Sequence, residues 1–208
     1  KVYEQAIKWS KIIDDLMKQY SSENNNLAID VCDPAGINAL NDNYNYKITN
    51  AQKFLEIARS IKSEDEIICM KAAVKTAEKG ISLMHESLQA GMTEEELWSI
   101  LHKTNIENGG EWFETRLLNS GPKTNPWFQE CSNRIIQKGE IVAFDTDMVG
   151  PYGYCADISR TFVVGHKFND EQKNLYSMAI DQINHNSDLI EDGLSFREFV
   201  EKSWVLPK

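Results

Sequence analysis

The sequence has 208 residues, enough for one large domain or for a smaller domain and part of another. Its formal net charge of −10, from 32 acidic and 22 basic residues, disfavours nucleic acid and membranes as partners. Apolar runs fall short of the roughly 18 residues of a membrane-spanning helix. The start of the chain lacks a signal-peptide pattern, and the four cysteines are scattered. We therefore expect a cytoplasmic protein.

The first 58 residues predict alternating helices and short strands. Apolar residues at helical spacing indicate a helix over residues 3–20. A short strand at 27–31 precedes a brief helix that opens at Asp33, and another strand ends at 46–48. One or two strands cannot form a stable sheet alone. We therefore interpret residues 1–58 as the C-terminal part of an α/β N-terminal domain.

Capping boxes mark the helices of the second region. Ser63 with Glu66 starts a long helix to about residue 88, and Thr93 with Glu96 starts another to about residue 107. The elements that follow are a β-prone run at 111–118, a turn-rich loop at 120–127, a β-hairpin at 141–165, a helix from Asp170 to Glu191 and a helix that a third capping box starts at Ser195. This order predicts an α+β domain over residues 59–208, with helices on one face of an antiparallel sheet.

The predicted hairpin carries three aspartates. Asp145 and Asp147 are two residues apart and so share one face of their strand, and Asp157 lies across the turn on the partner strand. Two unit charges about 4 Å apart repel by roughly 4 kcal/mol at an effective dielectric of about 20. The carboxylates therefore either face water or hold a cation. Spacing alone leaves both a solvated turn and a metal site with oxygen ligands open.

Three motifs extend the argument beyond the hairpin. They are residues 61–67 at the entry to the long helix, residues 90–97 at the start of the next helix, and residues 153–162, Gly-Tyr-Cys-Ala-Asp-Ile-Ser-Arg-Thr-Phe. Together they resemble the pita-bread metalloenzymes, the family of methionine aminopeptidase, prolidase and creatinase. The resemblance implies a pita-bread metal-binding catalytic domain over 59–208, preceded over 1–58 by the end of a creatinase/prolidase-like N-terminal domain.

Two departures from the peptidase pattern stand out. The peptidases have one aspartate in the first strand, with ten residues between it and the second. Here Asp145 leaves eleven residues before Asp157, and Asp147 leaves nine. The peptidases also place a histidine in the preceding loop, where Trp127 lies in this chain. A peptidase without that histidine should be impaired, so hydrolysis of an Xaa-Pro peptide is the second choice.

Residues 144–157, with 125–127 upstream and 202–207 near the end, resemble one non-peptidase branch, the dimethylsulfoniopropionate lyases. That resemblance implies an iron-associated homodimer that cleaves a small zwitterionic substrate to dimethyl sulfide and acrylate. It implies two metal ions, with manganese, cobalt and zinc as alternatives to iron. It also implies three metal ligands on the hairpin: Asp145, Asp147 and Asp157.

Aromatic residues near these aspartates suit such a substrate. A sulfonium is a cation without hydrogen-bond donors, and an aromatic face attracts it. We therefore predict Trp127 and Tyr154 as substrate-binding residues, with ordinary core or loop packing as the alternative for both.

The family resemblance also implies partners for the aspartates. The family completes its metal site with a histidine and two glutamates from later in the chain, and in the lyase branch the general base follows that histidine. These positions would lie beyond Lys208, so no catalytic base is assigned. We expect a fragment lacking N-terminal and C-terminal portions, with weak metal binding and no activity alone. Three function classes remain open: the β-eliminating lyase, a metallo-aminopeptidase or Xaa-Pro dipeptidase, and a non-catalytic pita-bread binding protein.

Overall fold

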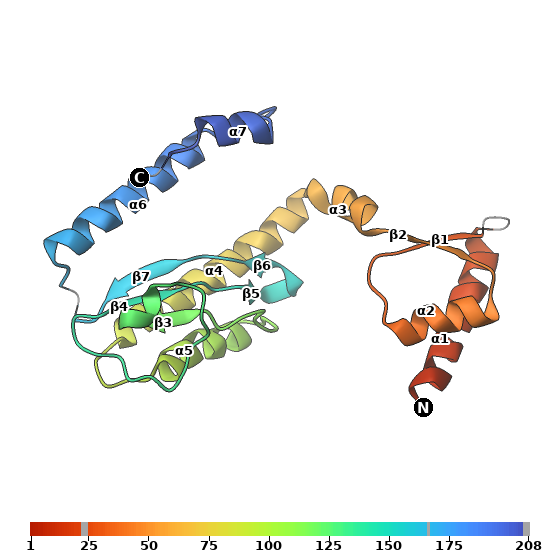
Figure 1. Cartoon of the computed structure of the whole chain (residues 1–208), viewed down its shortest axis with the longest axis horizontal. Helices are drawn as coiled ribbons and strands as arrows, with labels where there is room; N and C mark the ends of the chain where they lie inside the picture. The colour runs from red at the N-terminus through yellow and green to blue at the C-terminus, as the bar shows by residue number, and fades with distance from the viewer. Residues whose placement is uncertain (22–24, 166, 206–208) are drawn as a thin grey trace. The chain divides into compact units, whose positions relative to one another are not determined.

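The computed structural model describes residues 1–21, 25–165 and 167–205 (Figure 1). The chain divides into two compact units, residues 1–66 and 67–208. The expected domain boundary after residue 58 stays a prediction. Two residues of the closing motif, Leu206 and Pro207, lie outside the described residues.

The first unit contains the predicted alternation of helices and strands. Its elements are α1 (Val2–Tyr20), β1 (Asn26–Ile29), α2 (Pro34–Asn43), β2 (Lys47–Asn50) and α3 (Gln52–Ser60). The two strands pair in parallel. The side chain of Asp33 caps α2 by accepting a 2.9 Å hydrogen bond from the amide of Gly36, and Pro34 occupies the first turn. The predicted helix over 3–20 is confirmed by α1.

Capping boxes begin the first two helices after residue 60, as predicted. For α4 (Glu64–Ser87), the amide of Ser63 donates to Glu66 at 2.7 Å and the amide of Glu66 donates back to the Ser63 hydroxyl at 3.3 Å. For α5 (Glu94–Glu107), the same exchange joins Thr93 and Glu96 at 2.8 and 3.1 Å. These contacts satisfy amides that a helix N-terminus otherwise leaves unpaired.

The sheet of this unit is antiparallel, in the order β3-β4-β7, with a separate β5-β6 pair. Its strands are β3 (Leu118–Ser120), β4 (Ile141–Phe144), β5 (Met148–Val149), β6 (Cys155–Ala156) and β7 (Arg160–Val163). The β4-β7 and β5-β6 pairings share one register, because Phe144 lies opposite Arg160 and Met148 lies opposite Ala156. The predicted hairpin is therefore present, with an interrupted middle.

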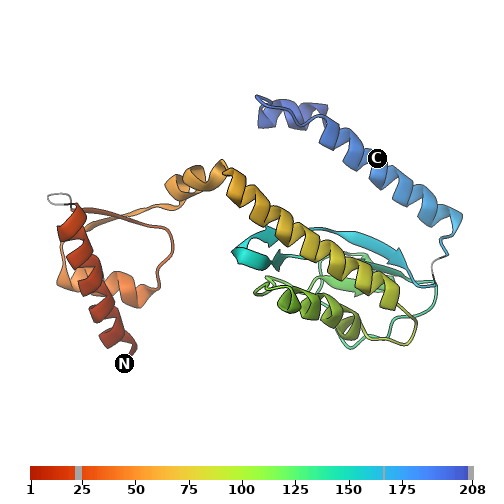
Figure 2. The same ribbon diagram turned by 180° about the vertical axis from the view of Figure 1, so that it is seen from behind.

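Helices α4 and α5 cover one face of this sheet (Figure 2). Val142, Phe144 and Met148 are almost fully buried. Val142 and Phe144 pack in one cluster with Met84 and Leu97, and Met148 packs in another with Ala73 of α4. Side chains alternate along a strand, so the odd-numbered positions between them face away from the helices. The prediction of helices on one face of an antiparallel sheet is confirmed for α4 and α5.

The predicted strand over residues 111–118 is wrong for most of its length, because the regular strand begins only at Leu118. The preceding residues still run antiparallel to residues 145–149. The amide of Val149 donates to the carbonyl of Trp112 at 2.9 Å, and Phe113 bridges Met148. The irregularity arises where this run passes the aspartates.

Two helices end the described chain. Helix α6 (Asp170–Asp188) stops three residues before the predicted end at Glu191, and α7 (Phe196–Lys202) begins at the predicted capping box of Ser195. Within the described ranges, no helix is both long enough and apolar enough to cross a membrane.

Candidate metal centre

The hairpin ladder is interrupted where its aspartates lie. The common register of the flanking strands places Asp147 opposite Asp157 and Asp145 opposite Ser159. Neither pair belongs to a regular strand, and Asp147 has a φ of +37°. Left-handed backbone is unfavourable for most residues, but aspartate tolerates it better than most. The interruption lets Asp147 turn its carboxylate away from the ordinary strand direction.

Thr146, between the two aspartates, joins the strands across this interruption. It is fully buried, and its hydroxyl donates to the carbonyl of Ala156 at 3.1 Å and accepts from the amide of Ile158 at 2.9 Å. A side-chain hydroxyl thus takes over pairing that the backbone otherwise supplies. We did not single out Thr146 from the sequence. The sequence did contain a signal for its role, because Thr146 is a polar residue at a position that strand alternation places on the buried face.

A β-bulge flanks the first strand on its other side. The amide of Asp145 donates to the carbonyl of Leu117 at 2.9 Å, and Phe113 bridges Met148. Three residues, 114–116, therefore lie opposite the two residues 146–147. Bulges of this kind turn side chains and are frequent beside active sites. Here the bulge brings the hydroxyl of Thr115 to the carboxylate of Asp147, to which it donates a hydrogen bond.

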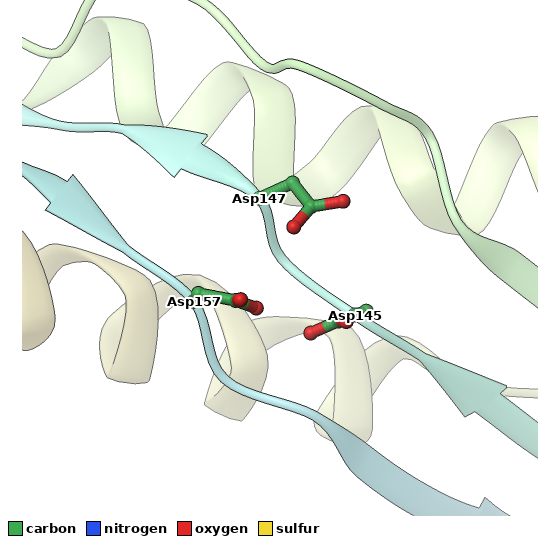
Figure 3. A group of neighbouring side chains, drawn as sticks. All are labelled: Asp145, Asp147 and Asp157. Carbon is green, nitrogen blue, oxygen red and sulfur yellow. The ribbon is translucent and has the colours of Figure 1, made fainter. Parts of the chain in front are cut away.

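The three aspartates converge on one point (Figure 3). Each offers a carboxylate oxygen, and the three oxygens lie within 4.8 Å of one another. Asp145 and Asp147 are partly buried, and Asp157 is exposed. The hydroxyl of Ser159 donates to Asp145 at 3.0 Å, so hydroxyl groups orient two of the three carboxylates. Such contacts fix the direction of ligand oxygens at metal sites.

The electrostatics of the cluster favour a cation. The pKa of Asp157 is raised to about 6, first by its hydrogen bond with Asp145, then by partial burial and by repulsion from Asp145, Asp147 and Glu114. The cluster thus holds a proton on Asp157 up to about pH 6, because full ionisation is unfavourable. A divalent ion with oxygen ligands would neutralise the same charge more completely, so the residues present fit a metal ion.

Metal binding should therefore depend on pH. An ion must displace the proton held near Asp157, so affinity should rise by about tenfold per pH unit up to about pH 6 and then level off. In the metal-free chain, the stability of the fold changes with pH in the opposite direction. A raised carboxyl pKa stabilises the fold at low pH, and this contribution disappears as pH rises through about 6. Calorimetric titration with Mn²⁺ from pH 5 to 8 measures the first effect. An affinity independent of pH would contradict this interpretation of the cluster.

The hydroxyl of Thr115 should matter for affinity. Thr115→Val keeps the size and removes the donor to Asp147, so metal affinity should fall by about 10- to 100-fold. Thr115→Ser retains the hydroxyl and is the matched control, with affinity close to that of the unmodified protein. Mn²⁺ titration of both variants measures the difference. Equal affinities for Thr115→Val and Thr115→Ser would show that the hydroxyl does not orient Asp147.

The predicted aromatic residues lie in different places. Tyr154 is partly buried and packs against the cluster of Ala73, Ala77, Met148 and Ala156 on the helix-covered side of the hairpin. Strand alternation puts it on the opposite face from Asp157. Trp127 is 36% exposed and follows a short helical turn, η1 (Gly121–Thr124). The structure brings the three aspartates together, and the substrate-binding roles of both aromatics stay predictions.

Comparison with known proteins adds to this geometry. The model of metallopeptidase family M24 matches residues 68–204. The chain is 40% identical over 202 residues to the dimethylsulfoniopropionate lyase DddP of Roseovarius nubinhibens, covering 94% of this chain and 45% of that protein. For DddP of Roseobacter denitrificans the identity is 37% over 198 residues, covering 92% and 44%. The chain therefore spans about half the length of the curated relatives it matches.

A solved structure shares the fold. The Xaa-Pro dipeptidase of Bacillus anthracis superposes with a TM-score of 0.77 at 23% identity, covering 90% of this chain and 54% of that one. This likeness agrees with the predicted pita-bread architecture of the catalytic domain, preceded by an α/β unit.

Proposed function

Since the chain belongs to metallopeptidase family M24, a family of divalent-metal enzymes, we propose that it serves a metal-dependent lyase that cleaves dimethylsulfoniopropionate to dimethyl sulfide and acrylate. One observation carries the proposal. Both aspartates of the first strand, Asp145 and Asp147, turn toward the same point as Asp157. The resemblance to lyases rests on this pair of aspartates, and the similarity to two DddP proteins supports it.

The reaction is a β-elimination. A base removes a proton from the carbon next to the substrate carboxylate, the electron pair of that C–H bond forms the double bond of acrylate, and the C–S bond breaks to release dimethyl sulfide. A divalent ion held by the three aspartates would supply a Lewis acid for the substrate carboxylate and so acidify the neighbouring proton.

The residues of this chain would arrange these parts. Thr115 and Ser159 orient the carboxylates of Asp147 and Asp145. In the proposal, the indole face of Trp127 receives the sulfonium, an interaction worth about 2 kcal/mol when water is excluded. We also propose iron as the metal, two ions in the complete site and a homodimeric assembly.

Hydrolysis of an Xaa-Pro peptide is the second candidate. The structural likeness to an Xaa-Pro dipeptidase favours it as far as the fold is concerned. Trp127, where the peptidases have a histidine, opposes it.

The test uses the full reading frame that encodes this chain, purified with iron. The protein is given dimethylsulfoniopropionate and, separately, an Xaa-Pro dipeptide, while dimethyl sulfide is measured by gas chromatography and proline by chromatography. We expect dimethyl sulfide from the first substrate and none from an Asp147→Asn variant. Release of proline without dimethyl sulfide would overturn the lyase proposal in favour of the peptidase.

A further inference from the structure

Residues 121–131, here called the aromatic segment, leave the sheet after β3 and return beside it. At the return, the amide of Cys131 donates to the carbonyl of Arg116 at 2.8 Å, and Glu130 bridges Leu117. Between these points the segment exposes two neighbouring aromatic side chains, Trp127 at 36% and Phe128 at 74%.

This segment lies beside the aspartates. Leu117 pairs with Asp145 on one side and with Glu130 on the other. The return of the segment is therefore two strand spacings, about 10 Å, from Asp145. The amide of Gln129 also donates at 3.2 Å to the side chain of Asn119, which is fully buried. Asn119 follows Leu118, whose side chain is in the helix-packed core, so alternation places Asn119 on the same face as the aspartates.

A single buried carboxylate holds both ends of the segment. Glu94, the first residue of α5, is fully buried. One of its oxygens accepts from the amide and the hydroxyl of Ser120 at 2.9 and 2.8 Å. The other accepts from Lys123 at 2.7 Å and from the amide and hydroxyl of Ser132 at 3.0 and 2.8 Å. Ser120 precedes the segment, Lys123 is within it and Ser132 follows it.

These contacts make Glu94 a satisfied anion in the interior. Burial by itself raises the pKa of Glu94, but the hydrogen bonds from Lys123, Ser120 and Ser132 bring it below the ordinary value. A buried charge is stable only when it is paired and hydrogen-bonded in this way, and loss of one partner leaves the others unsatisfied. The network therefore ties the base of the segment firmly to α5.

We propose that Glu94 is a positioning residue that holds the aromatic segment against the metal centre, and that this segment recognises the cationic end of the substrate. The inference rests on the proposed function. In this proposal Glu94 does not itself contact the substrate. It acts by placing Trp127 and Phe128, so its loss should change substrate affinity more than the chemical step.

Glu94→Gln tests this role, with Glu95→Gln as the matched control. Glutamine presents an amide N–H₂ where one carboxylate oxygen now accepts hydrogen bonds, so either Ser120 or the Lys123–Ser132 side loses its acceptor. Glu95 occupies the same helical turn, but its side chain is exposed. Hydrogen–deuterium exchange of residues 120–132 should quicken at least tenfold in Glu94→Gln and stay unchanged in Glu95→Gln.

Kinetic measurements on the protein expressed from the full reading frame then distinguish a loss of positioning from a general loss of structure. Glu94→Gln should raise KM for dimethylsulfoniopropionate at least tenfold, while kcat stays within threefold and metal content is unchanged. Glu94→Gln with Lys123→Met removes the facing cation as well and should recover part of the loss in KM.

The outcomes distinguish the inference from the proposed function. Unchanged exchange in Glu94→Gln, or a loss confined to kcat or metal content, overturns the role of Glu94. If the unmodified protein releases no dimethyl sulfide, the proposed lyase fails, and KM is measured for the Xaa-Pro dipeptide instead. An unchanged KM for that dipeptide in Glu94→Gln, despite faster hydrogen–deuterium exchange, would show that the segment does not contact substrate.

Discussion

Replacing Asp157 by asparagine should abolish metal binding and at the same time stabilise the metal-free protein. Asp157 provides one of three converging carboxylates, so its loss should weaken binding of a divalent ion by more than about 100-fold. Its pKa is raised to about 6, first by its hydrogen bond with Asp145 and then by partial burial and repulsion from the neighbouring carboxylates, so its ionised form is disfavoured in the cluster. Removing its charge relieves that repulsion at pH 7.5, which is above the pKa of Asp157.

Two measurements test this substitution, one for the loss of metal binding and one for the gain in stability. Calorimetric titration with Mn²⁺ should show no binding, and thermal unfolding with a chelator should show a raised midpoint at pH 7.5 that disappears at pH 4.5. Asp181→Asn, an exposed change on α6, is the control and should alter neither. Retained metal binding in Asp157→Asn would contradict a three-aspartate site, and a lowered midpoint would contradict the repulsion.

Thr146→Val should be among the most destabilising changes at the site. It keeps the side-chain volume but leaves the Ile158 amide and the Ala156 carbonyl without their partner. Each unpaired buried group costs about 1–3 kcal/mol, so the loss of both partners should cost about 2–6 kcal/mol. Denaturant unfolding of the metal-free chain measures it, and metal affinity should fall because the strands that hold the aspartates separate.

The hydroxyl itself is tested by Thr146→Ser, which retains both hydrogen bonds and should lose little stability. If Thr146→Val and Thr146→Ser unfold at the same denaturant concentration, the hydroxyl does not join the strands. The β4-β7 and β5-β6 ladders would then suffice to hold the interrupted middle.

Local signals accounted for the elements that were predicted well. The capping boxes at Ser63, Thr93 and Ser195 involve residues three apart, so their helix starts follow from neighbouring side chains. The hairpin followed from two β-prone runs around a turn at residues 150–153. Period-two alternation placed Asp145 and Asp147 on one face.

The details of the site depend on contacts distant in sequence. The bulge at residues 114–116 exists because that run packs beside residues 145–149, about thirty positions later. No local pattern marks it, and so a regular strand over 111–118 was predicted wrongly. The bonds from Ser120, Lys123 and Ser132 to Glu94 are likewise distant from α5 in sequence.

Tyr154 shows the opposite case, in which a local rule was available. Its nearness in sequence to Asp157 suggested a place at the site. Three positions along an extended strand reverse the direction of a side chain, and the structure packs Tyr154 on the helix side, while its substrate-binding role stays a prediction.

Anomalous diffraction from crystals of the iron-loaded protein, grown from the full reading frame, tests the central claim most directly. We predict an iron peak between the carboxylates of Asp145, Asp147 and Asp157, about 2.0–2.2 Å from an oxygen of each, as transition-metal ions bind carboxylates. Iron bound elsewhere, with only water beside these three carboxylates, would contradict the three-aspartate metal site.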